Sequence, residues 1–319
     1  MPSIGPVTDP ELDELLDSLP VTAGRPRTVE DLPGGLTNRN LKVTTPAGTV
    51  VVRIPAPGPS LLGIDRDHEY ANSTAAAAAG VGAPVLHYRP GTGLVVGYLP
   101  GRTLTDADLH DPDVLRRVAA ACQQLHAGPR FANDFDMFEV QARYRRIVAE
   151  HGFRLPPRYD EFAPVVADIR TVLGPRVGTV PCHNDLLAEN FLACDDGCGG
   201  ERVRIIDYEY AGNNDPCFEL GNIWSEATLP PRLLDVLVTA YFGGPRPAQL
   251  ARARLFGLVA KYGWMLWAAI QDGSSPLDFD FWSWGLQKYE RAVAEFDGSE
   301  LRGLLAAAAK PESWTGDPG

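Results

Sequence analysis

Alternating apolar and polar positions dominate roughly the first hundred residues of the chain. This period of two is typical of half-buried β-strands, and Pro-Ala-Gly and Pro-Gly-Thr-Gly turns separate the alternating runs. One internal run is rich in Ala and lacks alternation, which favours a helix. The pattern predicts hairpins at 41–45 with 49–54 and at 84–88 with 94–99, and helices at 9–19 and 67–79.

A helical period replaces the alternation after Pro100-Gly101. Short strands are expected only between 179 and 207. The predicted helices span 112–127, 136–150, 158–173, 216–227, 230–242, 248–272, 279–296 and 299–309. The pattern predicts an α+β protein with two lobes, a small β-rich lobe over 1–98 and a larger, mostly helical lobe over 99–319.

Composition narrows the class of partner. The 319 residues carry a net charge of -12, which argues against nucleic acid or an anionic membrane surface as partner. No apolar run approaches the ~20 residues of a membrane span, so membrane insertion is not expected. The N-terminus lacks the pattern of a signal peptide, and the five cysteines are an odd number. These features favour a reducing, cytoplasmic location.

A His-Asn-Asp turn carries the candidate catalytic chemistry. Asp185 ends this turn, Asn190 follows five residues later, and a hydrophobic strand then ends at Asp207. A carboxylate on a tight loop can orient a hydroxyl and accept its proton, so Asp185 is the candidate catalytic base. Asn190 and Asp207 offer the hard oxygen ligands that Mg²⁺ prefers. His183 is expected to brace the loop by bonding backbone carbonyls.

A Gly-Gly loop and a charged strand residue supply candidate contacts to a nucleotide. Arg53 ends the apolar run 50–52, and a cation inside a buried strand needs a partner. Glu69, on the Ala-rich helix, is the expected partner, and backbone groups near the lobe junction are expected to hold the adenine. The candidate ATP-binding residues are Gly34, Gly35, Thr37, Asn38, Arg53, Glu69, Gly97, Tyr98 and Leu99.

Two tryptophans, Trp264 and Trp267, lie three residues apart and share one face of a predicted helix. Aromatic faces attract quaternary ammonium groups. With spacing alone, such a pair is more often part of ordinary core packing. The pair therefore becomes a candidate binding feature only together with other motifs.

Together these segments resemble the choline/ethanolamine kinase family, within the wider group of aminoglycoside-phosphotransferase-like small-molecule kinases. The resemblance runs from about residue 30 to 296, and the family has an Arg where Arg53 stands in place of the usual kinase Lys. It is carried by the segments 34–38, 51–54, 183–190, 206–214 and 264–271. It implies a protein-kinase-like fold of two lobes, ATP and Mg²⁺ as cofactors, and a chain closest to the bacterial branch.

The resemblance also implies an acceptor. It points to a small cationic amino-alcohol, with choline as the expected substrate and its hydroxyl as the phosphorylated group. The residues that match the family's acceptor site are Tyr210, Glu226, Trp264, Trp267 and Trp284. One departure is Lys261, where the family usually has His. Pointed into the pocket its ammonium would repel choline, and pointed outward it would be a solvated helix residue.

Three other functions compete with this interpretation. A kinase of an aminoglycoside, another antibiotic or another small alcohol would keep the reaction, but polycations usually call for several carboxylates rather than aromatic walls. A non-catalytic pseudokinase would lack Asp185, Asn190 or Asp207, and all three are present. A hydrolase around Cys182 and His183 is disfavoured, because adjacency in sequence does not make a nucleophile–base pair.

Overall fold

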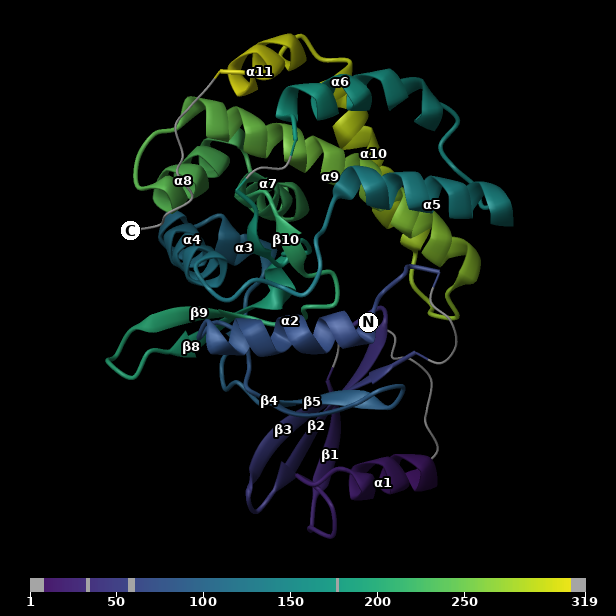
Figure 1. The fold of residues 1–319 in the computed structure, drawn as a ribbon, viewed down its shortest axis with the longest axis vertical. Coiled ribbons are helices and arrows are strands. Elements are labelled where there is room, and N and C mark those ends of the chain that lie inside the picture. The colour runs from purple at the N-terminus through teal and green to yellow at the C-terminus, as the bar shows by residue number, and fades with distance from the viewer. Residues whose placement is uncertain (1–8, 33–34, 57–60, 176–177, 311–319) are drawn as a thin grey trace.

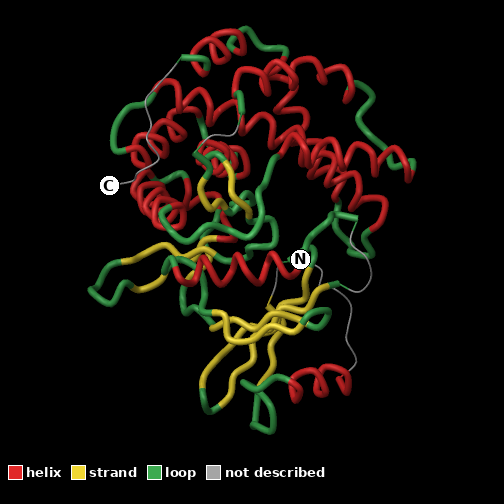
Figure 2. Tube along the Cα trace, viewed as in Figure 1, coloured by secondary structure: helices red, strands yellow, loops and turns green. Residues whose placement is uncertain are grey.

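The computed structural model describes residues 9–32, 35–56, 61–175 and 178–310. Gly34, one of the candidate nucleotide contacts, lies outside these ranges. The chain forms a small lobe around an antiparallel sheet and a larger helical lobe (Figures 1 and 2). This is the α+β arrangement of two lobes that the sequence predicts.

The small lobe is a five-stranded sheet flanked by two helices. The strand order is β1-β2-β3-β5-β4, and every neighbouring pair is antiparallel. The elements are α1 (Asp9–Ser18), β1 (Thr28–Leu32), β2 (Asn38–Thr45), β3 (Gly48–Pro55), α2 (Arg66–Ala78), β4 (Val85–Arg89) and β5 (Gly93–Gly97). Figure 1 shows α2 between the sheet and the helical lobe. Buried leucines of α1 pack with Leu41, Val43 and Val52 of the sheet into a small separate core.

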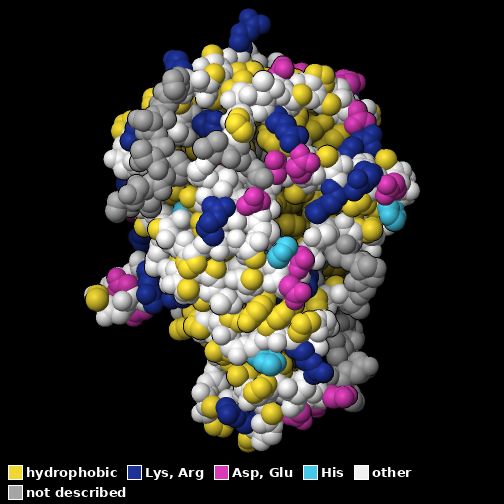
Figure 3. Space-filling model, in the orientation of Figure 1, with side chains coloured by type: hydrophobic (Ala, Val, Ile, Leu, Met, Phe, Trp, Pro, Cys, Tyr) yellow, Lys and Arg dark blue, Asp and Glu magenta, His cyan; other side chains and the backbone are white. Residues whose placement is uncertain are grey.

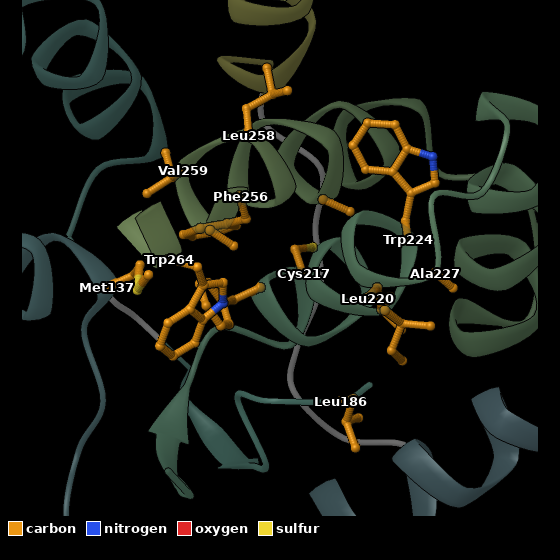
Figure 4. Packing of buried hydrophobic residues seen from close by; sticks show 14 of the residues in the cluster. Met137, Leu186, Cys217, Leu220, Trp224, Ala227, Phe256, Leu258, Val259 and Trp264 are labelled. Carbon is orange, nitrogen blue, oxygen red and sulfur yellow. The ribbon is translucent and has the colours of Figure 1, made fainter. Parts of the chain in front are cut away.

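The large lobe is built around one long helix, α9, whose side chains are buried over most of its length. Figure 4 shows side chains of α7 and α9 packed together. The two helices approach closely because both carry a glycine, and a Cβ on Gly221 would lie 2.1 Å from the carbonyl oxygen of Ala253. The helices are α3 (Asp106–Leu109), α4 (Pro112–His126), α5 (Met137–His151), α6 (Ala163–Leu173), α7 (Pro216–Glu226), α8 (Pro231–Phe242), α9 (Pro247–Ser274), α10 (Phe281–Phe296) and α11 (Leu301–Ala308).

Short strands of the large lobe hold the two segments that carry the catalytic candidates. One pair is β7 with β10, and a second sheet has the order β6-β8-β9. The loop 183–190 leaves β7, and the segment 206–211 connects β9 to β10. The strands are β6 (Arg102–Thr103), β7 (Val180–Cys182), β8 (Phe191–Asp195), β9 (Glu201–Ile205) and β10 (Gly212–Asn214). Both candidate segments are therefore fixed at their ends by backbone pairing.

The predicted hairpins and helices are confirmed, with two differences. The range 158–173 is not one helix, because a 3-10 turn, Tyr159–Phe162, precedes α6 and Pro164 stands in the first turn of that helix. The short elements β6 and α3 were not expected, since two to four residues show no period. None of the helices in the described ranges combines the length and apolar character needed to cross a bilayer. Basic and acidic side chains are interspersed over the face in Figure 3.

Candidate active site

The loop after β7 adopts a constrained backbone that sets the position of Asp185. Asn184 has φ 68°, a left-handed conformation that is uncommon outside glycine. Its side-chain amide donates to the carbonyl oxygens of Cys182, Tyr210 and Gly212, each at 3.1 Å. These bonds stabilise the strained residue and tie the loop to the 206–212 segment.

A buried carboxylate on α7 also holds this loop. Glu219 is fully buried and accepts hydrogen bonds from the backbone amides of His183, at 2.6 Å, and Asn184, at 2.8 Å. Its other neighbour is His126, with 3.5 Å between Nε2 and Oε1. Burial alone would raise the pKa of Glu219, but the hydrogen bonds from His126 and from the backbone amide of His183 lower it below its usual value. Glu219 therefore stays ionised and positions the residue before Asp185.

Sequence reasoning missed Glu219 and His126. The signal for Glu219 was a lone acid inside the apolar run Cys217-Phe218-Glu219-Leu220, where a buried charge demands partners. Together with Cys182 these two side chains offer ligand atoms within 4.8 Å of one another. Each is already engaged in the hydrogen bonding beneath the loop.

His183 braces the loop, as predicted. Its Nε2 lies 2.9 Å from the carbonyl oxygen of Ile206, and burial lowers its pKa, so the ring is neutral. Burial likewise raises the pKa of the Cys182 thiol, and the histidine near its sulfur is His126 rather than His183. A thiolate nucleophile at Cys182 is therefore disfavoured.

Asp185 is partly exposed, and its backbone oxygen accepts a hydrogen bond of 2.8 Å from the side chain of Asn190. Burial raises the pKa of the Asp185 carboxyl well above its usual value, and the negative charges of Glu226, Glu209 and Asp207 raise it further. A raised pKa strengthens the carboxylate as a proton acceptor.

Arg53 joins the two lobes. Its Nε lies 3.0 Å from Glu69 Oε1, which is the predicted pair, and its guanidinium also donates to Asp207. Asp207 itself has φ 74°, a second left-handed residue at the site. Burial opposes ionisation of Asp207, but the charge and hydrogen bond of Arg53 hold its pKa below the usual value. Glu69 and Asp207, two of the candidate functional residues, thus share the Arg53 guanidinium.

Glu209 and Arg66 extend this network and were missed from the sequence. Arg66 NH1 lies 2.6 Å from Glu69 Oε2 and 3.1 Å from Glu209 Oε2. Glu209 also accepts from Thr37 Oγ1, at 2.7 Å, and from Asn38 Nδ2, at 2.8 Å. Burial and the charges of nearby acids raise the pKa of Glu209 to about 7. The sequence signal for Glu209 was its position, two residues after the candidate metal ligand Asp207.

A cleft of about 610 Å³ opens between the lobes beside this network. Most of the candidate nucleotide and metal residues line it, whereas Thr37 and Asn38 are engaged with Glu209. Gly35 has φ 88°, and a Cβ there would lie 2.9 Å from the backbone oxygen of Asn38, so the tight turn requires glycine. The candidate residues on the wall are Gly35, Arg53, Gly97, Tyr98, Leu99, Asn190 and Asp207.

The structure brings the four candidate aromatic residues of the acceptor site together. Tyr210 packs edge-on against Trp264 with ring centroids 5.5 Å apart, and its hydroxyl accepts a 2.8 Å hydrogen bond from Trp267 Nε1. The ring centroid of Trp284, on α10, lies 5.3 Å from that of Trp267. Trp264 and Trp267 are buried, whereas Tyr210 and Trp284 are partly exposed. Residues far apart in sequence thus form one aromatic cluster.

Two charged residues near the cluster, Glu226 and Lys261, lie in surroundings that the sequence did not predict. Glu226 is not free, because it pairs with Lys288, a residue that sequence reasoning missed. Lys261 adopts neither expected orientation, since it is buried and its Nζ lies 3.3 Å from Glu295 and 4.0 Å from the ring centroid of Trp224. It is therefore neither a solvated helix residue nor a cation inside the aromatic cluster.

Comparison with known proteins gives the family. Residues 28–255 match the phosphotransferase enzyme family. A choline/ethanolamine kinase family protein from Mesorhizobium loti is 31% identical, with a TM-score of 0.81 over 94% of this chain and 98% of that one. The chain belongs to the choline/ethanolamine kinase family of phosphotransferases. It is thus a small-molecule kinase, as the motifs predict.

Two further relatives agree with this family. Protein LicA from Haemophilus influenzae is 29% identical over 249 residues, which are 74% of this chain and 91% of LicA. The structure of a LicA in complex with AMP is 21% identical and has a TM-score of 0.70 over 95% of this chain and 100% of that one. At this level of identity, the similarity to the AMP complex shows a shared fold.

Proposed function

We propose that the protein transfers the γ-phosphoryl group of ATP, with Mg²⁺, to the hydroxyl of a small cationic amino-alcohol, with choline as the first acceptor to test. The observation that carries the proposal is the placement of Asp185. Its backbone oxygen accepts a hydrogen bond from Asn190, which lines the cleft between the lobes, and the preceding residue, Asn184, bonds the backbone of Tyr210 in the aromatic cluster. A base between a phosphate site and an ammonium site suits phosphorylation of an amino-alcohol.

The proposed nucleotide site is the cleft between the lobes. Its apolar walls suit the adenine, and the backbone of 97–99 would bind its edge. Arg53, held by Glu69, is the proposed phosphate-binding cation, with Gly34 and Gly35 allowing the loop to approach the phosphates and Thr37 and Asn38 steadying it. The AMP bound by LicA, a protein of the same fold, supports a nucleotide here.

Asn190 and Asp207 are the proposed Mg²⁺ ligands. The fit rests on their donor chemistry, since an amide oxygen and a carboxylate held ionised by Arg53 both suit a hard cation. Bound there, Mg²⁺ would neutralise charge on the phosphates. The protein's own part is to keep Asp207 ionised and to hold Asn190 against the backbone of Asp185.

On the acceptor side, Tyr210, Trp264, Trp267 and Trp284 are the proposed walls for an ammonium group, with Glu226 as its charge partner. Asp185 would accept the hydroxyl proton as the phosphoryl group arrives. We assign nucleotide binding to the lobe over 1–98, and acceptor binding and chemistry to the lobe over 99–319. Aromatic residues where a polycation would call for carboxylates favour an amino-alcohol over an aminoglycoside.

The test is an ATP-coupled assay over choline, ethanolamine, other amino-alcohols and aminoglycosides. We expect turnover with an amino-alcohol that needs Mg²⁺, and a loss of about 10²- to 10⁴-fold in kcat for Asp185→Ala. The control Asp113→Ala removes an exposed carboxylate on α4 and should keep full activity. Turnover that survives Asp185→Ala would refute the mechanism, and turnover of aminoglycosides alone would refute the acceptor. Nucleotide binding with no turnover of any acceptor would favour a pseudokinase.

A further inference from the structure

Two lysines on neighbouring helices are buried in the same manner. Lys261 of α9 and Lys288 of α10 are 5% and 4% exposed. Each ammonium pairs with a glutamate and lies over a tryptophan ring, at 4.0 Å from the centroid for Lys261 and 4.2 Å for Lys288. A carboxylate combined with an aromatic face is also how proteins recognise ammonium ligands. Each lysine is thus bound by its own protein as an ammonium ligand would be.

The two lysines differ in whether their partners belong to the proposed acceptor site. Lys261 contacts Glu295 and Trp224, which lie outside the proposed acceptor site. Lys288 contacts Glu226 and Trp284, which are both proposed acceptor residues. The Lys288 ammonium therefore occupies the carboxylate oxygen and the ring face that an acceptor's ammonium would use.

One oxygen atom of the Glu226 carboxylate has no hydrogen-bond partner among the described residues. Glu226 accepts from Lys288 through Oε2, whereas Oε1 is buried and has no hydrogen-bond partner among the described residues. A buried acceptor without a partner is costly, and an N–H donor relieves the cost. A primary ammonium brings such donors, but a quaternary ammonium has none. An open cavity of about 610 Å³ borders this group, and Glu226, Trp284 and Lys288 are among the residues that line it.

The two kinds of ammonium therefore meet different obstacles. A primary ammonium can bind Glu226 Oε1 while Lys288 stays in place. A quaternary ammonium depends on aromatic faces, and the Lys288 ammonium lies over the face of Trp284. Displacing Lys288 would break a buried ion pair, which opposes binding.

We propose that Lys288 is a specificity-determining residue, a tethered cation that disfavours quaternary relative to primary ammonium alcohols. The inference rests on the proposed function, because it concerns the acceptor of that reaction. It concerns the ratio of the specificities for choline and ethanolamine, and it predicts that the wild-type site binds a primary ammonium more readily than a quaternary one.

The experiment compares kcat/KM for choline with kcat/KM for ethanolamine. Lys288→Ala removes the ammonium and uncovers the ring, so the choline-to-ethanolamine ratio should rise about three- to thirtyfold, the range of one cation–π contact from an exposed to a desolvated site. Lys288→Met removes the charge but leaves a side chain over the ring, so its rise should be smaller. The matched control is Lys261→Ala, which deletes an equally buried ammonium from a Glu–Trp pair elsewhere and should leave the ratio unchanged.

A second measurement needs no variant. In the wild-type enzyme, methylammonium should compete with the acceptor more strongly than tetramethylammonium does. The reverse order would overturn the proposal, even if the Lys288 variants fail to fold. An unchanged or lower ratio in a folded Lys288→Ala variant, or an equal rise in Lys261→Ala, would also overturn it. A wild-type enzyme that phosphorylates neither alcohol would instead overturn the proposed function and the inference with it.

Discussion

The two sides of Asp185 are built on different principles. The side that we propose binds the nucleotide is a network of ion pairs that crosses the lobes, with Arg53 and Arg66 of the small lobe bound to Asp207 and Glu209 of the large lobe. The side that we propose binds the acceptor lies within the large lobe and consists of packed aromatic rings with a buried ion pair. We infer that changes on the first side affect both stability and nucleotide use, whereas changes on the second affect acceptor choice.

Breaking the interlobe network should have the largest effect. Arg53→Met would leave Glu69 and Asp207 without their shared guanidinium, and loss of one partner from a buried network costs about 3–5 kcal/mol. Urea unfolding should report this loss, and the KM for ATP should rise. The control Arg116→Met breaks an exposed pair with Asp113 and should cost about 0–1 kcal/mol. Equal unfolding free energies for the two variants would contradict the comparison.

The support beneath Asp185 belongs to neither side and should affect the chemical step. Glu219→Gln removes the charge that holds the amides of His183 and Asn184, so the loop loses its fixed geometry. We expect kcat to fall by about 10²-fold while both KM values stay nearly constant. Steady-state kinetics with each substrate varied would show this. A raised KM at unchanged kcat would show that Glu219 acts on binding instead.

An acceptor-side change should leave nucleotide use untouched. Trp267→Phe removes the indole N–H that bonds Tyr210 and part of the aromatic wall, so the KM for the acceptor should rise about three- to tenfold. The KM for ATP should stay the same. Trp282→Phe is the matched control, because Trp282 lies on α10 against Arg154 and outside the cluster. An altered KM for ATP in Trp267→Phe would mean that the two sides are not independent.

A final prediction concerns the dependence of stability on pH that the buried Lys261 confers. Burial lowers the pKa of Lys261 to about 8, from about 10.5 for an exposed lysine. Between these values the unfolded chain holds a proton that the folded chain has released, so the free energy of unfolding gains a rising contribution from pH 8 to 10.5. Lys261→Met should remove this contribution, of at most about 1.4 kcal/mol per pH unit. Identical slopes in wild type and variant, measured by urea unfolding, would contradict it.

Much of the fold follows from short-range pattern. Alternation predicts the hairpins because strand side chains point to opposite faces, and the helical period predicts α10 because one face of that helix is buried. The candidate catalytic residues were also visible, since Asp185, Asn190 and Asp207 lie within one short stretch of chain. The break before α6 and the short elements β6 and α3 were not visible, because so few residues carry no period.

Of the three ion pairs that Arg53 and Lys288 form with Glu69, Asp207 and Glu226, one followed from the sequence and two depended on the tertiary structure. The sequence by itself identified Arg53 as a buried cation and Glu69 as its partner, because a lone charge in an apolar strand must be compensated. Only the packed lobes decided that Asp207 shares that guanidinium, and only the packing of α7 and α10 against α9 decided that Lys288 pairs with Glu226, 62 residues away. A motif records which chemical groups are present. Which charges neutralise one another depends on distance in space, and distance is determined by how the helices pack.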